Sequence, residues 1–362
     1  MVKIPGLDRL ESFSGMMSAH KKADLTLVRD RLRAIRRLEL TSYSDLALRD
    51  TIALLTHATP TDQDAPGEDP LPTVFAVVNE SISRRQGAWR FFDLPEPSLK
   101  GETLGRLHGL ADSISQTPDY DRAVSEWVSG GRSCWDSFDR AVTPIVAHLR
   151  LDAQEKILVQ TLLFVRQRSL AEYTANILLP ACFYQALRSC GRNSALEFQV
   201  TDEQIMAGIL LYQGKIVEMN AGEGKTIAAV FPSVLHAVQG RTVHVITAND
   251  YLAGRDADWL APIYESLGVS VGAVLDVMDE SERRFAYGKD VVYGALREFG
   301  FDFMRDNLKL SSSEIVQRKL DVAIVDEADH ALIDEANIPL IIAGGSGAPP
   351  KITAKLRATI ER

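Results

Sequence analysis

The stretch that decides the predicted fold is residues 219–226, MNAGEGKT. Gly222 and Gly224 let the backbone turn tightly enough for successive N–H groups to point at one phosphate group. A helix predicted to begin at Lys225 would direct its positive dipole end at the same group. Lys225 would then reach the β- and γ-phosphates of a nucleotide, and the Thr226 hydroxyl would ligate Mg²⁺. The stretch therefore predicts a phosphate-binding loop, in the short G-x-G-K-T form because it begins with Met rather than Gly.

A second motif follows an apolar, β-branched run at residues 320–325, LDVAIV, which predicts a buried parallel strand. Such a strand places Asp326 at the carboxyl edge of the sheet, where ligands bind in open α/β folds. Asp326 is the candidate Mg²⁺ ligand, and Glu327 is the candidate general base for the attacking water. Either acid alone would indicate a solvated carboxylate at a helix start, and the loop alone could be a glycine-rich turn. Together they predict nucleoside triphosphate hydrolysis, with Lys225 and both acids as catalytic residues.

Gln204 precedes the loop, and its amide offers the donor and the acceptor that pair with adenine N6 and N7. An isolated exposed glutamine would carry no such meaning, so the prediction depends on its position ahead of the loop. We therefore expect ATP and Mg²⁺ as cofactors, with the nucleotide bound by Gln204, Gly222, Glu223, Gly224, Lys225 and Thr226 and the metal by Thr226 and Asp326.

Strands and helices alternate from residue 199 to residue 345. The predicted strands are residues 215–219, 242–247, 269–275, 290–293 and 322–325, and the predicted helices between them include residues 252–267 and 298–307. This alternation is typical of a parallel sheet with helices on both faces. The predicted fold class is α/β, a P-loop RecA-like parallel sheet preceded by a mainly helical N-terminal region.

Longer stretches resemble the SecA family, the motor ATPases of bacterial preprotein translocation. The resemblance covers about residues 204–344 and is carried by IVEMNAGEGKT at 216–226, VHVITANDYLAGRD at 243–256, FGFDFMRDN at 299–307 and shorter words at 316–320, 325–327, 333–336 and 339–342. The chain departs from the family pattern at Ala328, where a Val is usual, at Ala295-Leu296 and at Asn337-Ile338. It therefore resembles a diverged relative.

The resemblance implies a first nucleotide-binding domain whose partners are a preprotein and a SecYEG-type translocon. In the family a second motor domain closes over ATP, so we expect either such a domain or self-association to complete the site. Residues 346–362 are expected to be a C-terminal helix or the start of a further domain.

The N-terminal region allows two interpretations. LPTVF at residues 71–75 resembles the family's segment ahead of the nucleotide core, but LPACF at residues 179–183 has the better spacing to Gln204. Either residues 94–198 are a helical insertion after an N-terminal segment of residues 1–93, or the second copy is the true equivalent. Helices are expected at residues 102–115, 120–127, 134–149 and 152–166, with Trp127 and Trp135 in their core.

Residues 25–38 predict an amphipathic helix rich in arginine. Its basic side chains indicate either a solvated face, which is the commoner case, or a surface for peripheral contact with an anionic membrane.

The composition of the chain argues against several classes of function. At 362 residues, with 46% hydrophobic and 25% charged side chains, two globular domains are the natural expectation. A formal net charge of −9 argues against nucleic acid as a partner, because binding phosphates normally requires a basic face. The three cysteines show no C-x-x-C spacing, which indicates neither a zinc site nor a disulfide framework. Without an apolar run of membrane-spanning length or a signal peptide, the expected location is cytoplasmic, with peripheral contact at the inner face of the cell membrane.

Two rival functions remain at this stage. An RNA helicase-like ATPase would show turnover stimulated by RNA, and the acidic charge balance opposes it. A nucleotide-dependent binding module would bind ATP with little turnover, and its helical half would serve as an adaptor surface.

Overall fold

The computed structural model describes residues 2–3, 25–57, 69–92, 102–130, 135–167, 177–190 and 198–342. Its centre is a four-stranded parallel sheet in the order β4-β5-β3-β6. The strands are β3 (Val243–Thr247), β4 (Val271–Val274), β5 (Val291–Ala295) and β6 (Val322–Val325). In register, Val245 of β3 lies opposite Tyr293 of β5 and Ile324 of β6. The predicted α/β class and the parallel sheet are confirmed.

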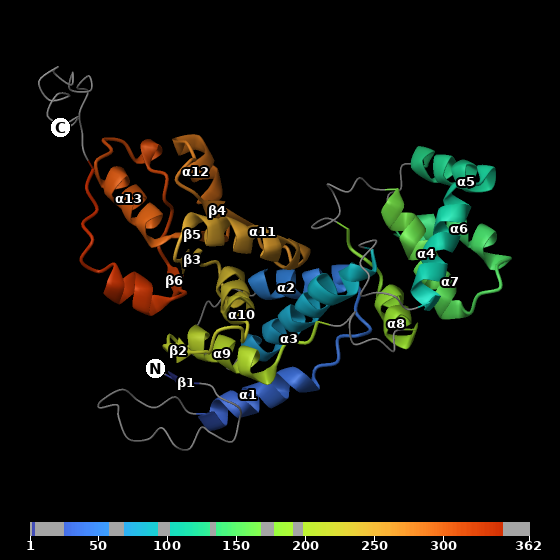
Figure 1. Ribbon diagram of the computed structural model, residues 1–362, viewed down its shortest axis with the longest axis horizontal. Helices are drawn as coiled ribbons and strands as arrows, with labels where there is room; N and C mark the ends of the chain where they lie inside the picture. Colours follow the sequence, from blue (N-terminus) through green and yellow to red (C-terminus); the bar gives the residue numbers. More distant parts are fainter. Residues whose placement is uncertain are drawn as a thin grey trace, which may run out of the picture.

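Helices cover both faces of this sheet because alternate residues of a strand point in opposite directions. On β5, Val291 and Tyr293 join the buried cluster that contains α10 (Lys225–Val238) and α11 (Asp250–Ser266). Val292 joins the cluster on the other face, which includes residues of α12 (Glu280–Ala286) and α13 (Leu296–Asn307). Figure 1 shows the sheet between these two pairs of helices.

The strand ahead of the phosphate loop is shorter than predicted. β2 is Val217–Glu218, and it pairs in parallel with β1 (Val2–Lys3) in a separate two-stranded sheet. The edge of β6 away from β3 carries no strand among the described residues. After β6 the chain forms a π-helical turn, His330–Asp334. A single 3-10 turn, Ser312–Glu314, precedes β6.

Four further helices pack on the same core as the sheet: α1 (Leu25–Arg37), α2 (Asp45–His57), α3 (Pro70–Ile82) and α9 (Asp202–Tyr212). The ring of Phe75 on α3 lies 5.1 Å from the ring of Phe231 on α10. The LPTVF segment at residues 71–75 therefore belongs to the hydrophobic core that also supports the phosphate loop.

A second hydrophobic core is built by α4 (Glu102–Ser115), α5 (Pro118–Ser129), α6 (Trp135–Ala147), α7 (Ala153–Arg166) and α8 (Ala181–Cys190). We call these five helices the helical unit; Figure 1 shows them on the side of the molecule away from α13. Trp127 and Trp135 pack at the edge of this core and are partly buried. Phe183 of the LPACF segment is fully buried here, so the two similar segments pack in two different hydrophobic cores.

A buried ionic network joins the helical unit to the nucleotide core. The chain continues from α3 through a π-helical turn (Ser83–Gly87) and a 3-10 turn (Ala88–Phe91). Arg84, in the first of these turns, donates to Asp45 at 2.9 Å and to Glu80 at 2.8 Å. From the helical unit, the Tyr184 hydroxyl donates to Asp45 at 2.9 Å and Arg188 donates to Glu80 at 2.9 Å. The division of the chain into domains, with residues 94–198 as an insertion or as part of an extension, stays a prediction.

None of the helices in the described ranges is long and apolar enough to cross a lipid bilayer. The segment at residues 346–362, expected to be a helix or the start of a further domain, lies outside the described residues.

Candidate functional site

The loop between β2 and α10 has the backbone that its glycines predict. Gly222 and Gly224 are both left-handed, with φ of 83° and 79°. Gly224 caps α10, and its carbonyl accepts from the N–H groups of Ile227 and Ala228 at 3.1 and 3.2 Å. The helix begins at Lys225, as predicted, so its N-terminal dipole faces the loop. This geometry suits an anion such as a phosphate.

Gln204 supports this loop from α9. Its Nε2 donates to the Glu223 carbonyl at 2.9 Å, and its Oε1 accepts from the Thr201 N–H at 3.0 Å. A Cβ placed on Gly224 would lie only 2.1 Å from the Gln204 Nε2. The amide expected to bind adenine is thus engaged with the protein itself, and adenine recognition by Gln204 stays a prediction.

The Glu223 carboxylate turns back onto the loop. It accepts from the Asn220 backbone N–H at 2.8 Å and from the Asn220 Nδ2 at 2.7 Å. The Glu223 N–H in turn donates to the Asn220 carbonyl at 3.3 Å. The side chain of Glu223 therefore closes the loop by bonding to Asn220. Glu223 would accordingly contact the nucleotide, as predicted, through its backbone.

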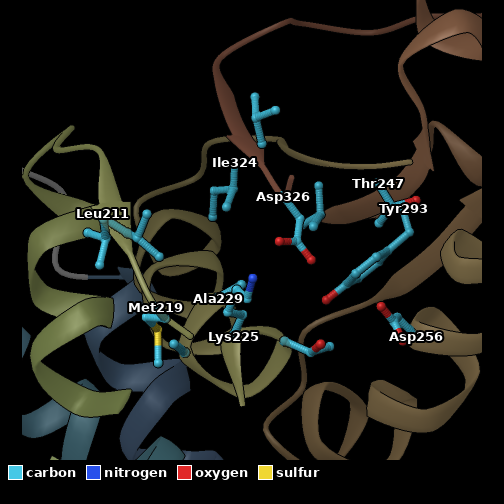
Figure 2. Close-up of a pocket in the computed structure, with 14 residues that line it drawn as sticks. Leu211, Met219, Lys225, Ala229, Thr247, Asp256, Tyr293, Ile324 and Asp326 are labelled. Carbon is cyan, nitrogen blue, oxygen red and sulfur yellow. The ribbon is translucent and has the colours of Figure 1, made fainter. Parts of the chain in front are cut away.

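A cavity of about 70 Å³ lies between the start of α10 and the carboxyl ends of the central strands. Figure 2 shows Lys225 and Asp326 facing the same space from α10 and from the end of β6. The polar side chains that line the cavity are Lys225, Thr226, Thr247, Asp256, Tyr293 and Asp326, and the apolar lining includes Leu211, Met219, Ala229 and Ile324. The structure thus brings together the predicted phosphate-binding lysine and both predicted metal ligands.

The donor chemistry of the cavity fits Mg²⁺. A carboxylate from Asp326 and a hydroxyl from Thr226 are the hard oxygen donors that this ion prefers, with water and phosphate oxygens as its remaining ligands. No group of three His, Cys, Asp or Glu side chains that could hold a metal occurs in the part of the chain that the structure describes. A magnesium ion here would accordingly depend on the nucleotide for much of its coordination.

Asp326 and Glu327 adopt an unusual local conformation. The Asp326 N–H donates to the Ile246 carbonyl at 2.8 Å and continues the pairing of β6 with β3. Its Oδ1 accepts from the Glu327 N–H at 2.9 Å. Glu327 has a φ of 51°, the one left-handed non-glycine residue among those described, and its side chain is exposed. Glu327 is not among the residues that line the cavity, so the candidate base does not reach the space that Lys225 and Asp326 share.

Three polar residues of the cavity, Thr247, Asp256 and Tyr293, were not predicted as site residues from the sequence. Asp256, on α11, is 3% exposed and accepts from Arg255 Nη2 at 2.6 Å. Tyr293, on β5, is 1% exposed, and its hydroxyl lies 3.1 Å from that of Tyr264. Burial raises the pKa of Tyr293 well above its usual value, helped by the Tyr264 hydroxyl and then by the charges of Asp256 and Asp326, so Tyr293 is a neutral hydroxyl at the cavity wall. One feature of the sequence could have pointed to Tyr293: it lies near the carboxyl end of a predicted parallel strand, where ligands bind in open α/β folds.

The family model described as the SecA DEAD-like domain matches residues 141–362. The chain is similar to a protein translocase subunit SecA from Halothermothrix orenii, with 46% identity over 197 residues that cover 54% of this chain and 23% of the relative. A second, from Rubrobacter xylanophilus, is 51% identical over 171 residues, 47% of this chain and 19% of the relative. A third, from Cellvibrio japonicus, is 47% identical over 182 residues, 50% of this chain and 20% of the relative. The matched region thus spans about a fifth of the length of these curated relatives.

Proposed function

Because the chain belongs to the SecA DEAD-like domain family, which matches residues 141–362, we propose that it is the ATP-binding motor domain of a protein translocase. The observation that supports this most directly is the meeting of Lys225, Thr226 and Asp326 at one cavity. A lysine at the start of a helix, a hydroxyl and a carboxylate are what a Mg·ATP site of the P-loop class requires.

Each residue has a distinct role in the proposed reaction. The Lys225 ammonium would bind the β- and γ-phosphates, and Thr226 and Asp326 would hold Mg²⁺, whose charge would offset that of the phosphates. Glu327 orients the attacking water and accepts its proton. Since Glu327 lies outside the cavity and its N–H is held by Asp326, its side chain must move toward the phosphates before it can act.

The partners are proposed on the same basis. The curated relatives are named as protein translocase subunits, which supports a preprotein and a SecYEG-type translocon as partners and a location at the inner face of the cell membrane. A second motor domain, from this or another chain, would close the cavity over the nucleotide and couple its state to partner contact.

Direct contact between α1 and an anionic membrane has less support. Three of its arginines already pair with aspartates: Arg31 with Asp69, Arg33 with Asp30 and Arg36 with Asp202. This pairing within the protein favours the interpretation of the basic side chains as an ordinary solvated face, and not as a lipid-binding surface.

We expect steady-state Mg·ATP turnover by the 362-residue chain to fall at least about 100-fold in Lys225→Ala and in Glu327→Gln. Lys319→Ala is the matched control, because it removes an exposed lysine that does not line the cavity. Turnover that survives Lys225→Ala would contradict the proposed site.

The rival functions are separated by what stimulates turnover. Vesicles that carry a translocon and a preprotein should raise the rate, whereas stimulation by RNA would support a helicase-like ATPase instead. Nucleotide binding without turnover under any condition would support a nucleotide-dependent binding module.

A further inference from the structure

Helix α1 packs against α3 and α9 of the nucleotide core, close to the N-terminal end of each (Figure 1). Val28, Leu32 and Ile35 bury one face of α1 in that core. Arg31 forms an ion pair at 2.8 Å with Asp69, the residue that caps α3. Five residues further along, Arg36 reaches the start of α9. The apolar stripe therefore fixes α1 on the core, and its arginines contact the beginnings of α3 and α9.

Arg36 holds the residues on both sides of the α9 cap. Its Nη2 donates to the Val200 carbonyl at 2.7 Å, and its Nε donates to the Asp202 carboxylate at 2.9 Å. The residue between them, Thr201, caps α9 through a reciprocal capping box with Gln204. The planar guanidinium makes both contacts at once, which a lysine ammonium would match poorly. Arg36 thereby fixes the backbone from which the Gln204 side chain extends.

Gln204 transmits that position to the phosphate loop. Its Nε2 donates to the carbonyl of Glu223, the residue directly before Gly224. The close approach of Gly224 to the same Nε2 leaves little freedom, since a Cβ at Gly224 would meet that nitrogen at 2.1 Å. A shift of the α9 cap would consequently move the loop or break its contact with Gln204.

We propose that Arg36 is a positioning residue for the nucleotide site, which acts from α1 through Thr201 and Gln204 on the phosphate loop. The inference rests on the proposed function, because it assigns a role in binding the nucleotide that the site is proposed to hydrolyse. A loop held in its binding conformation loses less freedom when the nucleotide binds, so Arg36 raises affinity without touching the nucleotide. The chemical step depends on Lys225, Asp326 and Glu327 and is left largely unchanged.

The same helix provides a matched control. Arg33 also forms an ion pair with an aspartate, but its partner Asp30 belongs to α1 itself, and both side chains are more than half exposed. Loss of Arg33 removes an arginine and an ion pair without reaching α9. A difference between the two positions would therefore report the link to α9 and not the charge of the helix.

The test measures the Kd of Mg·ATP, the steady-state KM and kcat, and thermal unfolding for Arg36→Ala, Arg36→Lys and Arg33→Ala. We expect Arg36→Ala to raise Kd and KM by about three- to tenfold, with kcat within about twofold of the unaltered chain. Arg36→Lys should recover part of the affinity, and Arg33→Ala should match the unaltered chain. An unchanged Kd in Arg36→Ala, in a chain that binds Mg·ATP, would overturn this inference alone.

A double-mutant cycle tests the route through Gln204. If Arg36 acts through that side chain, Arg36→Ala should change Kd little once Gln204→Ala is present. Fully additive effects would overturn the proposed route. Should Arg36→Ala fail to fold, Arg36→Lys replaces it, since it keeps the charge but not the planar guanidinium, and its Kd should still exceed that of the unaltered chain. No binding of Mg·ATP by the unaltered chain would overturn the proposed function and this inference with it.

Discussion

Gly224 shows how a single backbone position couples two parts of the site. Its φ of 79° suits glycine, and the space where a Cβ would project is filled by the Gln204 amide. The sequence alone predicted a tight turn at Gly222 and Gly224, because glycine allows backbone conformations that other residues rarely adopt. It did not predict that Gln204 would support the loop, since that depends on the direction in which a side chain leaves α9. Tyr293 and Asp256 were missed for a similar reason, because only the tertiary fold brings them to the cavity.

We expect Gly224→Ala to weaken Mg·ATP binding at least about tenfold, because the new methyl group adds steric conflict to backbone strain. Gly240→Ala is the control. Gly240 is also left-handed, with a φ of 72°, but nothing lies within 4 Å of a Cβ placed there. Gly240→Ala should lose stability by about 1–2 kcal/mol and keep its affinity for nucleotide. Equal affinities for the two variants in a binding titration would show that the contact with Gln204 is unimportant.

At the scale of secondary structure, the elements with strong apolar periodicity were predicted well. α4 and β6 have the predicted bounds, because long amphipathic or β-branched segments leave few alternatives. α12 was missed, since its seven residues are mostly polar and its start depends on a capping box formed by Asp279 and Glu282. The two Leu-Pro-x-x-Phe words could not be told apart from sequence, because both satisfy the same local pattern and only their packing partners differ.

The joint between the helical unit and the nucleotide core should be sensitive to loss of Asp45. This carboxylate is 4% exposed and accepts from Arg84, Arg85, the Tyr184 hydroxyl and the Leu179 N–H. Asp45→Ala would leave the buried Arg84 without one of its two carboxylate partners, so we expect the free energy of unfolding to fall by about 3–5 kcal/mol. Urea denaturation measures this, with the exposed Asp50→Ala on the same helix as the control. A loss below about 1 kcal/mol would mean that the network stabilises little.

For the molecule as a whole, stability depends on keeping several buried histidines neutral. His236 packs against the ring of Tyr212, and burial with the nearby Arg241 lowers its pKa to about 4. Burial also lowers the pKa of His108 and of His244. His108 lies in the helical unit, whereas His236 and His244 lie in the nucleotide core. Acid should therefore lower the stability of both parts of the molecule.

We expect stability to be lost as the pH falls from about 6.5 toward 4, because a histidine with a depressed folded pKa binds its proton more readily in the unfolded chain. Above the unfolded pKa the stabilisation is fully present, and it declines through the folded pKa. Urea midpoints at pH 7.5, 6.0 and 5.0 should decrease in that order. His236→Gln should reduce the slope, whereas the exposed His148→Gln should not. Midpoints that stay constant down to pH 5 would contradict the burial of neutral histidines.

The ionic joint at Asp45 also has a mechanical consequence. Figure 1 shows α5 at the end of the helical unit distant from the sheet, with α8 nearer the nucleotide core. Hydrogen bonds from Tyr184 and Arg188 anchor α8 to side chains of that core. A small rotation of the helical unit about this joint would therefore move α5 along a longer path than α8, because α5 lies farther from the joint. A pair of fluorophores on α5 and on α13 would report that rotation more sensitively than any pair within the sheet.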